Sequence, residues 1–164
     1  MFECVINIAE GRNHALLDEL SVAAGPSLRD RHADTFHHRG VFTLVDDADS
    51  LVHDVHRFIT AAFERLSLVG HAGVHPRIGV VDVVPFVPLD GDLEAASVLR
   101  DDTARWIART FDVPVFLYGP GGPTLPEIRR GAFTTLAPDV GPPVTHPRWG
   151  ACAVGARDVL IAWN

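Results

Sequence analysis

The chain has 164 residues, of which 47% are apolar and 21% are charged, as expected for one globular domain. The formal net charge is −7 and no basic run stands out, which excludes the usual nucleic-acid-binding classes because phosphates require a basic surface. No segment approaches the roughly 20 apolar residues of a membrane span, and we expect no secretory leader because Glu3 and Asn7 interrupt any early apolar run. We expect a cytoplasmic protein in which Cys4 and Cys152 are buried free thiols.

The first part of the chain predicts strands and one helix in alternation. Apolar residues alternate with polar ones over residues 2–8, which indicates a half-buried strand. Residues 14–24 have one apolar helical face, and a Gly-Pro pair ends the helix. Residues 28–32 and 41–45 are typical of strands, and the polar stretch 33–39 separates them.

The middle of the chain predicts two long helices around a buried strand. Apolar residues recur at helical spacing from Leu51 to Leu66, and a loop rich in Gly and His follows at 69–77. Residues 78–88 are almost continuously apolar, as in a buried strand. A third helix is expected at 93–111, and a further strand at 114–118.

The last part is rich in Pro and Gly. Residues 119–147 are expected to be irregular apart from a helical turn near 126–130, and a final strand is predicted at 159–163. The resulting order, β-α-β-β-α-β-α-β-β, indicates an α/β (α+β) fold. We expect a two-layer sandwich, with a mixed β-sheet, helices on one face, and a ferredoxin-like βαββαβ core with extra strands. Residues 1–164 contain no linker or repeat and form one domain.

Residues 78–88 are apolar on both faces, and such strands are usually covered on both sides. If all helices lie on one face, a second sheet or a second copy of the chain must cover the other. Burial under the chain's own long loop is the alternative, and we favour the partner.

Titratable residues concentrate at two strand boundaries, residues 30–39 and 70–82. His75 precedes Pro76, which restricts its backbone, and Gly73 and Gly79 permit close backbone approach to a ligand. A histidine held in this way suits general acid–base catalysis. A surface histidine without a role is the alternative.

Three charged residues accompany His75. Asp82 interrupts an aliphatic strand, which costs free energy unless it is paired, so an ion pair and a functional carboxylate are both open. Arg39 and Arg77 can each bind a carboxylate through two hydrogen bonds, although surface arginines are the default interpretation.

Metal binding is a second possibility, because several side chains of the two segments are potential ligands: Asp30, His32, His37, His38, His71 and His75. His71 and His75 are four residues apart, but Gly73 and Pro76 oppose a shared helix face. We therefore predict no metal site.

Five blocks of the chain resemble the N-terminal subdomain of the formiminotransferase family, in order and over nearly the whole length. The blocks are residues 2–13, 71–88, 114–119, 124–131 and 137–162. The most specific is the central one, His71-x-Gly73-x-His75-Pro76-Arg77-Ile78-Gly79-x-x-Asp82-Val83-x-Pro85-Phe86-x-Pro88.

The resemblance implies transfer of a formimino group from N-formimino-L-glutamate to tetrahydrofolate, the co-substrate, in histidine degradation and one-carbon metabolism. His75 corresponds to the family's proposed catalytic acid–base. Asp30 or His32 is expected to assist the proton transfer, and Arg39 or Arg77 to hold a substrate carboxylate. Four further residues are expected to belong to the substrate site: His38, His71, Asp82 and Gly79.

Family enzymes continue into a second α/β subdomain, with the folate between the two. We expect this C-terminal folate-binding subdomain to be absent from the chain, so that a homodimer or a C-terminal-subdomain chain completes the site and the chain alone turns over weakly. Two alternatives stay open: a non-catalytic folate- or glutamate-binding accessory module, and a metal-dependent hydrolase that uses the histidine cluster.

Overall fold

The computed structural model describes residues 1–160. They form six strands, four α-helices and a short 3-10 turn at Gly25–Ser27. In chain order the main elements are β1 (Phe2–Ile8), α1 (His14–Ala24), β2 (Leu28–Asp34), β3 (Arg39–Asp46), α2 (Ala48–Arg65), β4 (Val81–Pro88), α3 (Leu93–Phe111), β5 (Val115–Tyr118), α4 (Leu125–Gly131) and β6 (Cys152–Ala156).

The strands form one mixed sheet in the order β2-β3-β1-β4-β6-β5. β1 is antiparallel to both β3 and β4, and β2 is antiparallel to β3. β6 is parallel to both of its neighbours, β4 and β5. The first four strands therefore have the ferredoxin-like arrangement, and β6 and β5 extend it, which confirms the predicted α+β fold and core.

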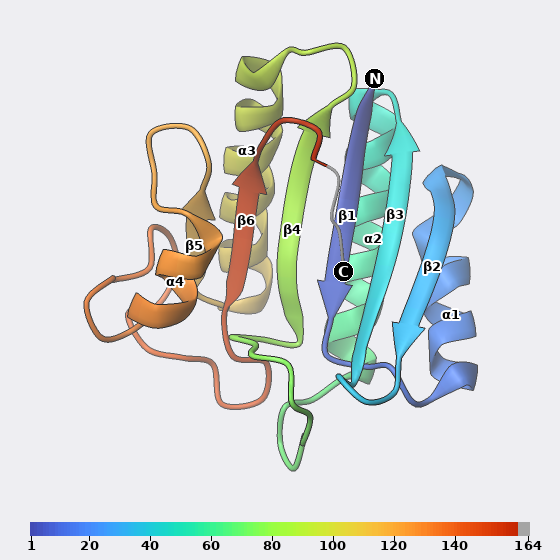
Figure 1. Cartoon of the computed structure of the whole chain (residues 1–164), viewed down its shortest axis with the longest axis vertical. Coiled ribbons are helices and arrows are strands. Elements are labelled where there is room, and N and C mark those ends of the chain that lie inside the picture. The colour runs from blue at the N-terminus through green and yellow to red at the C-terminus, as the bar shows by residue number, and fades with distance from the viewer. Residues whose placement is uncertain (161–164) are drawn as a thin grey trace.

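Three helices cover one face of this sheet, as Figure 1 shows for α1, α2 and α3. The amphipathic α2 buries one apolar stripe, and its Phe58 ring lies 4.6 Å from that of Phe42 on β3. The helix begins where the Asp47 side chain accepts a hydrogen bond from the Ser50 backbone N–H at 3.1 Å. These contacts place the main core between the helices and the sheet.

The opposite face is covered in part by α4, so the prediction of helices on one face holds for α1 to α3 only. Val83 and Val84 of β4 point to opposite sides, and Val83 joins a second core that contains Ile128 of α4 and Phe116 of β5. Every residue of β4 is buried within the single chain. The preference for a partner over β4 was therefore wrong, because the chain's own Pro/Gly-rich segment folds over this strand.

The end of the chain differs from the prediction. Val159 and Leu160 lie outside any strand, and the rest of the predicted strand 159–163 falls outside the described residues. The last strand among residues 1–160 is β6, whose sequence Cys-Ala-Val-Gly-Ala is buried at all five positions. Small residues without alternation give no strand signal, which is why this strand was not predicted.

On the sheet face opposite α1 to α3, α4 covers one part and no helix covers the other. There, β1 and β3 present half-buried valines, Val5, Val41 and Val45, which alternate on the same face with polar residues such as Asn7 and Thr43. Cys4 and Cys152 are buried free thiols, as predicted. Among residues 1–160, no helix has the length and hydrophobicity to cross a membrane.

Candidate active site

Three loops meet at one end of the sheet (Figure 1): the β1–α1 loop, the β2–β3 turn and the segment between α2 and β4. The backbone N–H of Gly11 in the first loop donates to His38 in the turn, at 3.1 Å. Arg77 of the third segment donates to the main-chain oxygen of His37 in the same turn, at 3.3 Å. The two histidine-rich segments of the sequence, about 40 residues apart, are thus one cluster in space.

His75 lies at the side of an open groove of about 390 Å³, on the sheet face opposite α1 to α3. The groove contains apolar residues of β4 and β5, such as Val83 and Tyr118, together with the side chains of Arg39 and Arg129. Small-molecule sites combine such an apolar surface with a few fixed polar groups. The predicted catalytic histidine therefore lies beside a cavity and not in bulk solvent.

The contact between His75 and Arg39 defines the protonation state of the imidazole. Arg39 Nη1 lies 2.8 Å from His75 Nε2. An arginine N–H can only donate, so Nε2 must accept and carries a lone pair. Partial burial, followed by the positive charges of Arg39 and Arg129, lowers the pKa of His75. The ring is therefore a neutral imidazole, ready to accept a proton.

Arg39 has further donor capacity. It begins β3 beside His75, and its Nε is buried and has no hydrogen-bond acceptor among the described residues. A buried N–H without an acceptor costs free energy.

Asp82 has both carboxylate oxygens engaged by protein groups. Its side chain is 4% exposed, Oδ1 accepts from the Ile78 N–H at 2.7 Å, and Oδ2 accepts from Arg129 Nη2 at 2.6 Å. Arg129 also donates to the main-chain oxygen of Pro76, the residue after His75. Arg129 thus joins α4 to the loop that carries His75, and the sequence indicated the charge in the strand but not its partner.

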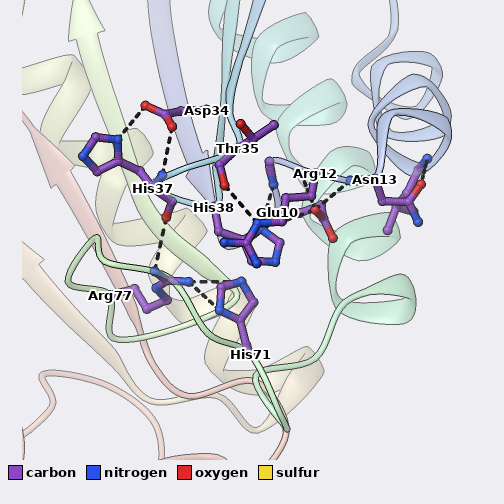
Figure 2. A network of polar contacts seen from close by, with 11 residues as sticks. Glu10, Arg12, Asn13, Asp34, Thr35, His37, His38, His71 and Arg77 are labelled. Atoms are coloured by element: carbon purple, nitrogen blue, oxygen red, sulfur yellow. Dashed lines mark hydrogen bonds and ion pairs between the residues drawn. The ribbon is translucent and has the colours of Figure 1, made fainter.

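The guanidinium of Arg77 contacts main-chain oxygens and a histidine ring of the protein. Nε and Nη2 donate to the main-chain oxygen of His75 at 3.0 and 2.7 Å. Nη1 lies 3.0 Å from Nε2 of the His71 ring, and Figure 2 shows Arg77 between His71 and the β2–β3 turn. This arrangement favours Arg39 over Arg77 as the group that holds a substrate carboxylate.

His38 and His71 stack on each other behind Arg77, with ring centroids 4.1 Å apart and planes 23° apart (Figure 2). His38 Nδ1 accepts from Gly11, so that ring nitrogen is unprotonated. Burial is the main cause of the lowered pKa of both rings, and the charge of Arg77 adds to it. The pair forms a stack of two hydrogen-bonded imidazoles, and its substrate-binding role stays a prediction.

His37, which the sequence analysis considered only as a potential metal ligand, forms a second imidazole site. Its Nδ1 lies 2.6 Å from Asp34 Oδ2, and its backbone N–H donates to Asp34 Oδ1 at 2.8 Å (Figure 2). The His37 ring centroid is 6.2 Å from that of His75. The spacing Asp-x-x-His in the polar stretch between two predicted strands was the available signal, since Asp side chains commonly bond to the backbone of a turn.

Asp30 and His32 are exposed on the edge strand β2, where they pair with Thr43 and Val41 of β3. No hydrogen bond joins either residue to His75 among the described residues. Their role in proton transfer stays a prediction.

Gly79 has a structural reason to lack a side chain. A Cβ at this position would lie 1.8 Å from the main-chain oxygen of Ala151, because residue 79 pairs with Gly150 in a short bridge. The close approach that Gly79 permits is therefore to the segment before β6, and a ligand contact stays a prediction.

Within residues 1–160, no group of three or more His, Cys, Asp or Glu side chains is arranged to hold an ion.

The chain is similar to proteins of known activity. Residues 1–157 match the family model of the formiminotransferase domain, N-terminal subdomain. Glutamate formimidoyltransferase of Streptococcus pyogenes serotype M1 is 36% identical over 181 aligned positions, which cover 99% of this chain and 60% of that protein. The protein of the same name from Thermoplasma acidophilum is 34% identical, with 100% of this chain and 61% of the relative covered.

Formimidoyltransferase-cyclodeaminase of Mus musculus is 34% identical over the whole chain, which covers 34% of that longer protein. The chain thus spans about 60% of the first relatives and about a third of the bifunctional one. The order of strands and helices, the His75 groove and the family match lead to one conclusion: this chain belongs to the formiminotransferase family, as its N-terminal subdomain.

Proposed function

We propose that this chain carries the acid–base residue of a glutamate formimidoyltransferase, which moves a formimino group from N-formimino-L-glutamate to tetrahydrofolate. The observation that carries the proposal is the neutral His75 imidazole at the groove, with Arg39 Nη1 2.8 Å from its lone pair. The names of the relatives from Streptococcus pyogenes and Thermoplasma acidophilum support the transfer reaction.

In this reaction the folate nitrogen must lose one proton and the glutamate nitrogen must gain one. The folate nitrogen attacks the formimino carbon and forms a new C–N bond, and it must then lose its hydrogen. The bond from that carbon to the glutamate nitrogen breaks, and this nitrogen must gain a hydrogen to leave as an amine. His75 accepts the first proton because its lowered pKa keeps it neutral near pH 7, and the imidazolium that forms gives this proton to the departing glutamate nitrogen.

A carboxylate of the substrate would free the Nε2 atom of His75 from its hydrogen bond with Arg39. Arg39 donates to the His75 lone pair in this structure, and its Nε has no acceptor among the described residues. A carboxylate bound to the Arg39 guanidinium through two hydrogen bonds would draw Nη1 away from His75. Binding of the substrate would thereby free Nε2 to act on the folate nitrogen.

A second subdomain or chain would complete the folate site. The groove is open on the sheet face that α1 to α3 leave free, and its volume of about 390 Å³ lies at the small end of known ligand sites. We propose that the relatives' remaining length supplies the opposite wall. The chain alone would then bind the glutamate part of the substrate but turn over weakly.

The test compares wild-type chain with a His75→Ala variant, each alone and mixed with the C-terminal subdomain of the Streptococcus pyogenes enzyme. We expect glutamate release with tetrahydrofolate as acceptor in the wild-type mixture, and at least about a 100-fold lower kcat for His75→Ala. A matched control is His14→Gln at an exposed position of α1, which should keep full activity. Equal activity of His75→Ala and wild type would exclude the catalytic role, and ligand binding without turnover in every mixture would favour an accessory module.

A further inference from the structure

We infer that Arg157 and Tyr118 form a second carboxylate-binding subsite in the groove beside His75, at the end of the groove that lies away from the imidazole. The subsite takes a carboxylate of a glutamate unit. The inference rests on the proposed function and deepens it, because the formimino donor carries two carboxylates and Arg39 accounts for only one of them.

The groove has an excess of positive charge. Its lining residues include Arg39, Arg129 and Arg157, and none of the lining residues that the structure describes is Asp or Glu. Arg129 is already paired with Asp82, with its Nη2 atom 2.6 Å from Oδ2. Arg39 and Arg157 are therefore the two cations of the groove that are left to bind carboxylates of a ligand.

Arg157 lies at the opposite end of the groove from His75. It follows β6 directly, and its backbone N–H donates to the main-chain oxygen of Phe86 at 3.1 Å. Arg39, which contacts His75, begins β3 close to the level of Val81 in the sheet. The distance from Val81 to Phe86 along β4 is about 16 Å at the rise of an extended strand. Because both arginines line the same groove, they approach a ligand from opposite ends.

Arg157 has hydrogen-bond donors that the described part of the protein does not use. Its Nη1 atom donates to the main-chain oxygen of Asp158 at 2.9 Å, and this is the only hydrogen bond of the guanidinium to a group within residues 1–160. The Nε and Nη2 atoms can therefore donate two parallel hydrogen bonds to a carboxylate. The side chain is half-buried, so solvent screens such an ion pair less than it would at an exposed site.

The ring of Tyr118 places its hydroxyl at the same end of the groove. Tyr118 of β5 pairs with Gly155 of β6, and Arg157 follows two residues later, on the same face of the sheet. A Cβ on Gly155 would lie 2.1 Å from Cζ of the Tyr118 ring, the carbon that carries the hydroxyl. The ring thus lies against the backbone of Gly155, and any side chain at position 155 would displace it.

The Tyr118 hydroxyl can donate a hydrogen bond to an anion. Burial raises the pKa of Tyr118, and the charge of Arg157 opposes this effect without outweighing it, so the hydroxyl keeps its hydrogen at neutral pH. Among the described residues the hydroxyl has no hydrogen-bond partner, whereas the main-chain oxygen of Tyr118 accepts from Arg100 at 3.3 Å. A carboxylate bound to Arg157 would supply the acceptor.

The surface between the two ends of the groove is apolar. Val5, Val83 and Pro85 line it, and the carbon chain between the two carboxylates of a glutamate unit is apolar as well. Two ligands of the proposed reaction contain such a unit: the formimino donor and the glutamate tail of tetrahydrofolate. The subsite recognises the same chemical group in both, so the experiment has to distinguish them.

The kinetic test uses the active mixture described for the proposed function. Arg157→Gln removes the cation, and Tyr118→Phe removes the hydroxyl but keeps the ring against Gly155. The control is Arg130→Gln, the same chemical change at an exposed position of α4 that does not line the groove. Each protein is measured with tetrahydrofolate and with tetrahydropteroate, which lacks the glutamate tail.

We expect Arg157→Gln to raise KM about 10-fold or more and Tyr118→Phe to raise it about 3-fold, with little change in kcat, because binding and not proton transfer is affected. A raised KM for the formimino donor with both acceptors identifies the donor as the ligand of the subsite. A raised KM for tetrahydrofolate but not for tetrahydropteroate identifies the folate tail. KM values of Arg157→Gln equal to those of the control overturn the inference, whereas absence of turnover in the wild-type mixture contradicts the proposed function.

A second measurement does not depend on turnover. Glutarate, which has the two carboxylates of glutamate without its nitrogen, is titrated into the chain alone and followed by NMR. We expect Arg157→Gln to weaken glutarate binding about 10-fold and Arg130→Gln to leave it unchanged. Glutaramide, in which both carboxylates are replaced by amides, should not distinguish wild type from Arg157→Gln. Equal glutarate affinity of the wild type and Arg157→Gln would overturn the inference.

Discussion

Among single side chains, Arg39 has the clearest effect on the chemistry of another residue. Its guanidinium donates to His75 Nε2, and its charge is the main cause, after burial, of the lowered pKa of His75. We expect Arg39→Gln to raise the pKa of His75, because the cation disfavours the protonated ring. The pH above which His75 is a neutral base would therefore move upward.

The measurement is an NMR titration of the His75 ring in both proteins. Arg31→Gln is the matched control, because Arg31 pairs with Asp18 of α1 on the other side of the sheet. A pKa of His75 that is unchanged or lower in Arg39→Gln would contradict the assigned electrostatics.

The sequence predicted some residues of the site because their neighbours in the chain restrict the backbone. His75 stands out because Gly73, Gly79 and Pro76 restrict the chain around it. The partners of the site residues were not predictable in the same way. Asp82 required a cation, but nothing local distinguishes Arg129, 47 residues away, among fourteen positively charged side chains.

Among the helices and strands, the segment that leads into β4 is tightly packed against the segment that leads into β6. A Cβ on Gly79 would lie 1.8 Å from the Ala151 oxygen, and the backbones on either side exchange hydrogen bonds of 2.8 and 2.9 Å. We expect Gly79→Ala to lower the free energy of unfolding by about 1–3 kcal/mol, because the backbone must move. Urea denaturation measures this change.

The control for this prediction is Gly122→Ala in an exposed loop, where the nearest atom to a Cβ would be 3.5 Å away. It should change stability by no more than about 0.5 kcal/mol. Equal stability of the Gly79→Ala and Gly122→Ala variants would refute the packing argument.

The contact between α2 and α3 predicts a dependence of stability on pH. His56 of α2 stacks on Trp106 of α3 with centroids 3.7 Å apart, and burial, with a smaller effect of His53, lowers the pKa of His56 to about 4. The unfolded chain, where a histidine titrates near about 6.5, binds the proton more readily. Stability should therefore fall as pH drops from 6.5 towards 4.

His56→Gln should weaken this dependence, and His14→Gln should leave it as in the wild type. Urea midpoints at pH 7, 6 and 5 provide the comparison. The same slope in the His56→Gln variant and the wild type would show that His56 does not titrate between the two states as described.

The sequence predicted the long elements better than the short ones. Periodic apolar residues predicted α1, α2 and α3, because each helix buries one stripe against the sheet. β6 was missed, since a strand buried on both faces has no alternation and its small residues have low strand propensity. The covering of β4 by α4 depends on contacts between distant segments, which periodicity does not report.

For the chain as a whole, the sheet face over β1 and β3 is the surface that we expect to associate. Val5, Val41 and Val45 are half-buried there without a helix above them. Apolar side chains on an uncovered sheet face favour pairing with a second copy or a second subdomain. We expect sedimentation velocity to detect concentration-dependent dimers.

Val41→Lys should shift the sedimentation towards the monomer. Val22→Lys is the control, because Val22 is 80% exposed on α1, and it should leave association unchanged. A wild-type chain that stays monomeric at all concentrations would exclude self-association through this face.

The position of β6 between β4 and β5 has a consequence for synthesis of the protein. β2, β3, β1 and β4 pair with one another and come entirely from the first 88 residues. β5 has β6 as its neighbour in the sheet, and β6 is made more than thirty residues later. During synthesis, the four strands of the first 88 residues can therefore pair before the rest of the chain is made. β5 has no neighbouring strand to pair with until residues 152–156 have been synthesised.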